Sequence, residues 1–174
     1  AAAVAAPGYT RFLPNLPPDV KQFFLPLRTS PNRAVAALEA DQNIRITAES
    51  SSLVYEPALL AMGSVSFVDR TRNVSETRVV TKLVHPGSLG AIVRWDEAED
   101  AAIDQRTLEP KPDSDQALYG EAPGELSTAA KVKRVEKDFI DYLYTGQTLD
   151  LHYSPVLKVY SQPAESERDF KARV

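Results

Sequence analysis

The sequence predicts an α+β fold, in which a mostly antiparallel sheet from residues 44–95 and 147–160 packs against one long helix at residues 127–145. Apolar and polar residues alternate through much of 44–95, which is typical of half-buried strands. The connections between these segments are too short for parallel crossovers, so hairpins are expected. Apolar residues recur at helical spacing in 127–145, which predicts the helix.

Residues 1–33 are rich in proline and predict an extended arm with one helical turn at 19–24, because proline fixes φ and removes a backbone donor. The arm is too apolar for a free linker, so we expect it to lie against this domain's core or against a neighbouring domain. Its large apolar residues are Phe12, Leu13, Phe23, Phe24 and Leu25. Residues 34–174 are then predicted to form a single domain.

A short helix is predicted over residues 30–43, where alanine and leucine are frequent. Ser30 or Asn32 can cap its start, and Asn43 is a suitable C-terminal stop.

Several strands are predicted between residues 43 and 95. "NIRITAES" alternates around Ile44 and Ile46, and Val54 and Tyr55 precede a Glu-Pro break. "GSVSFVD" and "ETRVVTKLVH" are joined by the polar turn "RTRNVS", which indicates a hairpin. "GAIVRW", residues 90–95, is a further strand candidate.

Residues 96–125 are acidic and poor in large apolar side chains, which favours a surface loop, with a disordered middle left open. The helix at 127–145 then presents one apolar face, formed by Val132, Val135, Phe139, Tyr142 and Leu143. Ser127 can cap its start and Gly146 can end it.

Two short strands, "QTLDLHY" and "VLKVY", are predicted before a final helix at residues 164–174. Pro163 can open this helix, and Glu165 and Glu167 suit its N-terminus. Its apolar stripe begins with Phe170 and Val174 and has no third member. We therefore expect the chain to be a piece of a longer protein in which this helix continues.

Composition excludes several classes of protein. Cysteine is absent, so neither disulfides nor thiolate metal sites can form, which fits a cytoplasmic protein. The net charge of −4 disfavours nucleic acid as a partner of this piece alone. No apolar run approaches the ~18 residues of a membrane helix.

No catalytic, cofactor-binding or metal site is predicted, because neither GxxxxGK[ST] nor GxGxxG occurs. His85 and His152 are interpreted as strand-surface or strand-end residues. The acidic run Asp113–Glu121 places Ala117 where a calcium loop needs an oxygen ligand. The carboxylates of "DEAEDAAID" favour a solvated face over acid–base catalysis. The basic residues Lys131, Lys133, Arg134 and Lys137 alternate with acidic ones, which favours an ordinary helix surface over a nucleic-acid contact.

Four segments together resemble a known family: "LVYEPALLAMGSVSFVD", "VRWDEAE", "KDFIDYLY" and "SPVLKVYSQPAESERDFKAR". Their order and spacing are similar to the region C-terminal to the motor in bacterial HerA/FtsK-like P-loop ATPases, which are helicase-like ATP-binding proteins. The segment "LPPDVKQFFLPL" resembles the link that leaves the motor. The resemblance covers most of residues 14–174, and the final segment is its most specific part.

The resemblance implies a non-catalytic accessory or scaffold domain that docks other domains or partners. The expected partners are the rest of its own polypeptide, namely a P-loop motor and a downstream helical segment, and a homo-oligomer formed through the parent protein. None of the family's nucleotide motifs matches a position here, so no catalytic residue is carried over. The alternative is a freestanding interaction module unrelated to an ATPase, and a small hydrolase or ligand-binding enzyme is a more distant third.

Overall fold

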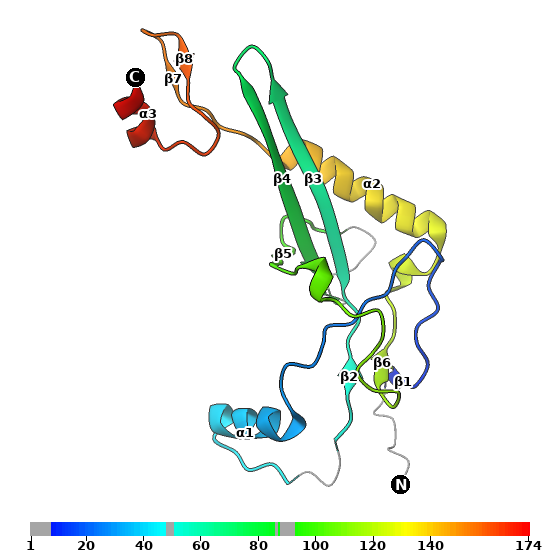
Figure 1. Ribbon diagram of the computed structural model, residues 1–174. Helices are drawn as coiled ribbons and strands as arrows, with labels where there is room; N and C mark the ends of the chain where they lie inside the picture. The colour runs from blue at the N-terminus through cyan, green and yellow to red at the C-terminus, as the bar shows by residue number, and fades with distance from the viewer. Residues whose placement is uncertain (1–7, 48–50, 86, 88–92) are drawn as a thin grey trace.

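A long β-hairpin and the helix beside it occupy the middle of the molecule in the computed structural model (Figure 1), which describes residues 8–47, 51–85, 87 and 93–174. The strands are β1 (Tyr9–Thr10), β2 (Val54–Tyr55), β3 (Leu59–Asp69), β4 (Val74–Val84), β5 (Glu99–Asp100), β6 (Leu118–Gly120), β7 (Tyr153–Ser154) and β8 (Val159–Tyr160). The helices are α1 (Pro31–Gln42), α2 (Ala129–Gly146) and α3 (Glu167–Arg173), with the short 3-10 turns η2 (Gln105–Thr107) and η3 (Gly124–Leu126). The predicted α+β class is confirmed.

The hairpin of β3 and β4 confirms the pairing predicted from the two alternating segments. Its antiparallel register runs from Leu59 opposite Val84 to Asp69 opposite Val74. The loop between the strands includes Asn73 at a φ of 53°, a conformation that asparagine tolerates better than most residues. β5 adds a short third strand at the outer edge of β4.

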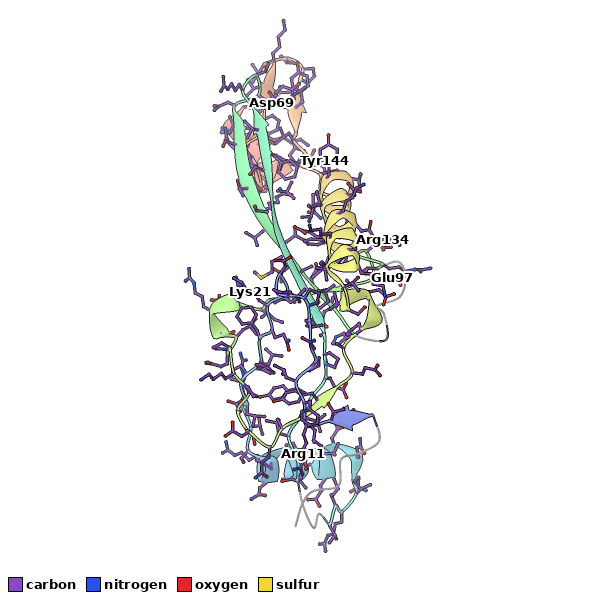
Figure 2. All side chains as sticks on the ribbon, turned by 90° about the vertical axis from the view of Figure 1, so that its right-hand side faces the viewer. Arg11, Lys21, Asp69, Glu97, Arg134 and Tyr144 are labelled. Atoms are coloured by element: carbon purple, nitrogen blue, oxygen red, sulfur yellow. The ribbon has the colours of Figure 1, made fainter. Side chains whose placement is uncertain are left out.

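Helix α2 lies alongside the hairpin (Figure 2). It packs its predicted apolar stripe onto one face of the hairpin. Phe139 and Leu143 are buried there with Val84, and the ring of Trp95 lies 4.7 Å from that of Phe139. The partly buried Val135 and Tyr142 border the same cluster. The hydrophobic core of this part of the molecule therefore lies between the hairpin and α2.

The caps predicted for α2 are wrong by one residue each. Thr128, not Ser127, is the N-cap, and its hydroxyl accepts a hydrogen bond from the Lys131 backbone N–H. The hydroxyl of Ser127 instead donates to the Gly124 carbonyl in η3, at 2.6 Å. Gly146 is the last helical residue rather than the stop, because Gln147 still donates its N–H to the carbonyl of Leu143.

A second, smaller core surrounds β6, the central strand of the sheet β1–β6–β2. Phe24 and Tyr119 are buried in it, and the ring of Tyr55 lies 5.0 Å from that of Phe24. The prediction of a surface loop over 96–125 is therefore wrong for Ala117–Gly120, which is buried. β2 and β6 are parallel, which the long connection between them permits, because the whole hairpin lies between them along the chain.

The arm lies partly against this core. Phe24 is buried and forms an isolated antiparallel bridge with Glu109, whereas Phe12 and Leu25 are exposed. The predicted helical turn at 19–24 is wrong, because only a turn closed by the N–H of Val20 and the carbonyl of Pro17 forms there. The division into an arm at 1–33 and a domain at 34–174 stays a prediction.

Helix α1 confirms the helix predicted over 30–43. Ser30 occupies the N-cap position without a side-chain hydrogen bond, and Asn43 ends the helix at a φ of 51°. No residue of α1 is buried. The strand predicted around Ile44 and Ile46 is wrong for residues 44–47, which have no strand partner in the described structure, and residues 48–50 lie outside the description.

Two other strand predictions have mixed outcomes. Residues 90–92 of "GAIVRW" lie outside the description, while Val93 and Trp95 are buried in the core under α2. The strands predicted within 147–160 shrink to β7 and β8, which form their own two-stranded ribbon and do not join the hairpin sheet. Residues 147–152 of the first predicted strand precede β7 without strand pairing, and residues 156–158 of the second lie in the turn between β7 and β8.

Helix α3 begins later than predicted, at Glu167, because the Ser166 hydroxyl caps it and Pro163 lies in a preceding turn. Phe170 is buried and its ring stacks on that of His152, at 6.1 Å. The guanidinium of Arg173 donates to Glu165 and to the carbonyl of Tyr160. These contacts join α3 to the β7–β8 ribbon.

Candidate functional site

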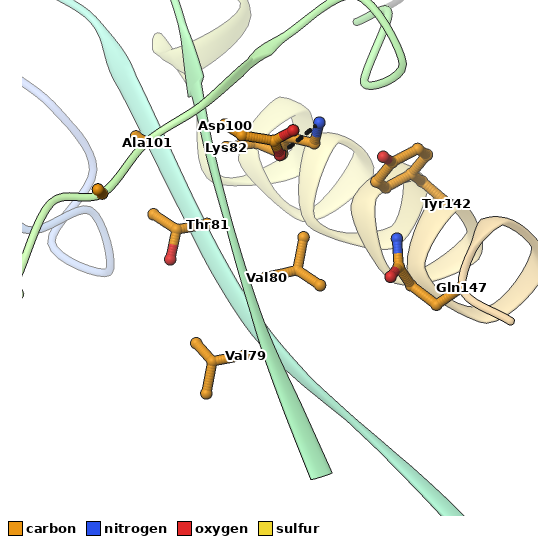
Figure 3. Close-up of a pocket in the computed structure, with 9 residues that line it drawn as sticks. Val79, Val80, Thr81, Lys82, Asp100, Ala101, Tyr142 and Gln147 are labelled. Atoms are coloured by element: carbon orange, nitrogen blue, oxygen red, sulfur yellow. Dashed lines mark ion pairs between the residues drawn. The ribbon is translucent and has the colours of Figure 1, made fainter. Parts of the chain in front are cut away.

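A hollow of about 450 Å³ lies beside the outer edge of β4, between that strand and the C-terminal end of α2 (Figure 3). It is lined by Val79, Val80, Thr81, Lys82, Asp100, Ala101, Ala102, Tyr142 and Gln147. Another hollow, of about 90 Å³, lies between Val93 and the first turns of α2.

The hollow exists because β5 leaves the edge of β4 after a short pairing. β5 is in register with β4 only at Lys82 and Leu83, and the N–H of Ala101 donates to the carbonyl of Thr81 at 3.1 Å. After β5 the chain turns away from β4, whereas β4 continues toward the hairpin loop (Figure 1). The outer edge of β4 beyond Thr81 therefore has no strand partner in the described residues.

Lys82 closes the inner end of the hollow and is only 5% exposed. Its ammonium lies 2.8 Å from the Asp100 carboxylate, donates to the Ala98 carbonyl at 3.3 Å, and stands 5.8 Å from the centre of the Tyr142 ring. The hydrogen bond to Asp100 raises the pKa of Lys82 above its ordinary value, against the opposing effect of burial. Lys82 is therefore held as a cation, the form that cannot act as an amine nucleophile.

The two histidines lie where the sequence predicted, at strand ends. His85 directly follows β4 and its ring lies 3.4 Å from the exposed Glu99 carboxylate, while His152 directly precedes β7. Within the described residues, neither ring hydrogen-bonds a serine or threonine hydroxyl. Among the residues that the structure describes, no three His, Cys, Asp or Glu side chains are grouped so that they could hold a metal ion.

The other charged segments serve local structure. Asp113 accepts a hydrogen bond from the N–H of Leu27 at 2.6 Å and donates its own N–H to the Tyr55 hydroxyl at 3.0 Å, while Ala117 is buried. In "DEAEDAAID", Asp104 caps η2. Among the basic residues of α2, Lys131 donates to the Gly124 carbonyl at 2.9 Å.

A second feature is the face of the hairpin that points away from α2, which we call the open face. It consists of Leu60, Met62, Ser64, Ser66, Val68, Ser75, Thr77, Val79, Thr81 and Leu83, the alternate positions of β3 and β4. None of these side chains carries a charge. Val68 and Val79 are 69% and 70% exposed, and the hydroxyls of Ser66 and Thr77 hydrogen-bond across the strands at 2.9 Å.

Sequence reasoning missed the pairing of Lys82 with Asp100. The available signal was the position of Lys82, which falls on the same face of its strand as the apolar Val80 and Val84 and so points toward the core. A buried lysine at such a position requires an anion or hydrogen-bond acceptor close to its ammonium. The sequence could not name Asp100, because that residue lies in a segment interpreted as a solvated loop.

Comparison of the chain with protein-family models, with curated proteins and with solved structures finds no match. Of the helices in the described part of the chain, none has the length and apolar character that crossing a membrane requires.

Proposed function

We propose that this chain is a non-catalytic accessory domain of a larger HerA/FtsK-like, DNA-translocase-type ATPase of the cytoplasm, and that it docks other domains or partners. The observation that carries the docking role is the open face. Two strands of eleven residues each hold an uncharged surface away from the core, with Val68 and Val79 mostly exposed.

Physical chemistry supports docking through this face. Sheets that face water on one side ordinarily carry polar and charged residues on that side, and exposed strands are commonly protected by lysine or proline. The open face contains neither lysine nor proline, and its polar residues are uncharged serines and threonines. A partner that covers this face therefore removes Val68, Val79 and Met62 from water without burying a charge. The link to an ATPase is supported by the four sequence segments described above.

The chemistry of the hollow also favours a non-catalytic role. Among the residues that line the hollow, the one buried cation is Lys82, and Asp100 neutralises it. A general base or nucleophile would need a free titratable group poised near neutral pH. The hollow instead combines an ion pair with aliphatic side chains.

Amide hydrogen exchange of the hairpin tests the docking role. Residues 64–79 should exchange more slowly in the natural full-length polypeptide than in this chain alone, because the open face is then covered. A Val68→Glu, Val79→Glu double variant of the full-length protein should lose that protection, while Ser64→Ala should keep it. Equal exchange in the short chain and the full-length protein would contradict docking through this face.

The natural reading frame tests the ATPase link separately. A GxxxxGK[ST] motif on the N-terminal side of this chain is expected. Its absence from the reading frame would favour the alternative, a freestanding protein-interaction module, for which the uncharged open face is equally suited.

A further inference from the structure

The outer edge of β4 offers unpaired backbone groups next to the hollow. In an antiparallel strand, the N–H and C=O of one residue point to the same edge, and successive residues alternate between edges. The carbonyl of Thr81 points to the outer edge, because it accepts from Ala101 there. The backbone groups of Val79, Thr77 and Ser75 therefore point to the same edge, and no described strand pairs with them.

The hollow lies along the outer edge of β4, next to the place where β5 ends its pairing with that strand. Ala101 and Ala102 border it where the chain leaves β4, and Tyr142 and Gln147 border it from the end of α2 (Figure 3). The side chain of Gln147 makes no hydrogen bond to another described residue. An extended segment placed here would thus meet a row of backbone donors and acceptors, small aliphatic side chains and one free amide.

We infer that this slot, the outer edge of β4 from Ser75 to Val79 together with the hollow, binds an extended peptide segment of a partner protein by strand addition. In strand addition, backbone hydrogen bonds give affinity, and pockets for alternate side chains give specificity. A hollow of about 450 Å³ is within the range of sites that hold small ligands, so it admits a few residues of one chain.

The charges around the slot indicate what the segment must be. Lys82 is paired with Asp100, and Arg78 is paired with Glu76 at 2.6 Å. Because these cations and anions neutralise each other in pairs, the slot has no excess of either sign to attract a charged segment. The chemistry that fits is an uncharged segment rich in β-branched residues, which favour the extended conformation.

A second copy of this chain fits the slot less well. Its own free strands lie in a hairpin that carries α2 on one face, whereas the slot is bordered by Ala101–Ala102 on one side and by Tyr142 and Gln147 on the other. A single strand can enter between these borders more readily than a hairpin with its helix. The inference rests on the proposed docking function and names the chemistry of the partner.

The test uses an acetylated, amidated and fluorescently labelled peptide, KGTVTVTGK, in which lysines serve solubility and the centre is an uncharged β-former. Fluorescence anisotropy with this chain should show saturable binding, and the proline-containing peptide KGTPTPTGK should not bind, because proline removes backbone donors. Amide exchange should slow at residues 75–79 when the first peptide binds. Absence of saturable binding would overturn the inference.

Val79→Pro and Val79→Thr are the matched variants. Val79→Pro removes the N–H that points into the slot and should weaken binding by about tenfold, the change that loss of one well-formed hydrogen bond produces. Val79→Thr keeps the N–H and a β-branched side chain, so binding should stay within about twofold of the original, since no backbone bond is lost. Equal affinity of both variants would show that the peptide binds elsewhere.

Circular dichroism checks whether the Val79→Pro variant folds. If it does not fold, Gln147→Trp is the replacement variant. The tryptophan side chain should fill the hollow while the sequence of β4 stays unchanged, so peptide binding should be abolished. The chain could instead self-associate in a concentration-dependent way, and Val79→Pro could abolish that self-association. This result would identify a second copy as the occupant and overturn the inference. If the peptide fails to bind while the open face is still protected in the full-length protein, this inference falls and the docking function stands.

Discussion

Gly63 of β3 and Leu143 of α2 approach so closely that a Cβ atom on Gly63 would lie 2.5 Å from Cδ1 of Leu143. The same atom would lie 3.2 Å from Cε1 of Phe139. A glycine in the interior of a strand weakens the strand but allows another element to approach its backbone closely. Gly63 is therefore the point at which the helix rests on the hairpin.

Gly63→Ala should lower the free energy of unfolding by about 1–3 kcal/mol, the usual cost of adding a methyl group to a filled core. Chemical denaturation measures this. Ser64→Ala, one residue along on the open face, is the control and should change stability by no more than about 0.5 kcal/mol. A Gly63→Ala variant as stable as the original protein would mean that α2 lies further from β3.

Phe139→Ala should cost about 3–5 kcal/mol of unfolding free energy, because it empties a buried aromatic site between Trp95 and Leu143. Ile140→Ala is the matched control on the same helix. Ile140 is 55% exposed, so its truncation should have a small effect. A loss below about 1 kcal/mol for Phe139→Ala would contradict the packing of this stripe on the sheet.

The hairpin and α2 could be predicted because their signals are local. Apolar residues alternate in β3 and β4, and they recur at helical spacing from Val132 to Leu143, so each element shows its buried face in its own sequence. The open face follows from the same alternation, once the helix has been assigned to the other side of the sheet.

The sheet around β6 could not be predicted, because its pairing is non-local. Leu118–Gly120 is short, lies in an acidic segment, and is paired with β1 and β2, which come from far earlier in the chain. The burial of Phe24 depends on the same assembly. The hollow was missed for a related reason, because its position depends on where β5 leaves β4. A strand of two residues is too short to show an alternating pattern in the sequence.

Isothermal titration calorimetry with Mg-ATP should show neither binding nor hydrolysis by this chain. The sequence lacks a glycine-rich loop followed by lysine and a helix, which would cradle the phosphates. A P-loop ATPase measured under the same conditions provides the positive control. Micromolar binding of Mg-ATP to the chain would contradict this prediction.

The C-terminal segment should loosen in acid before the rest of the molecule does. Hydrogen bonds from Arg173 lower the pKa of Glu165 from 4.5 to about 2, with a further contribution from the N–H of Gln162. Because the folded pKa lies below the unfolded one, the stabilisation is fully present above pH 4.5 and is lost as the pH falls toward about 2. Amide chemical shifts of α3, followed from neutral pH into this window, should move away from their folded values while those around Phe139 stay unchanged.

Glu165→Gln should remove most of this pH dependence, leaving the smaller part due to Glu167, whose pKa is lowered by Lys171. An unchanged acid response in Glu165→Gln would show that the bridge to Arg173 does not hold α3 in place.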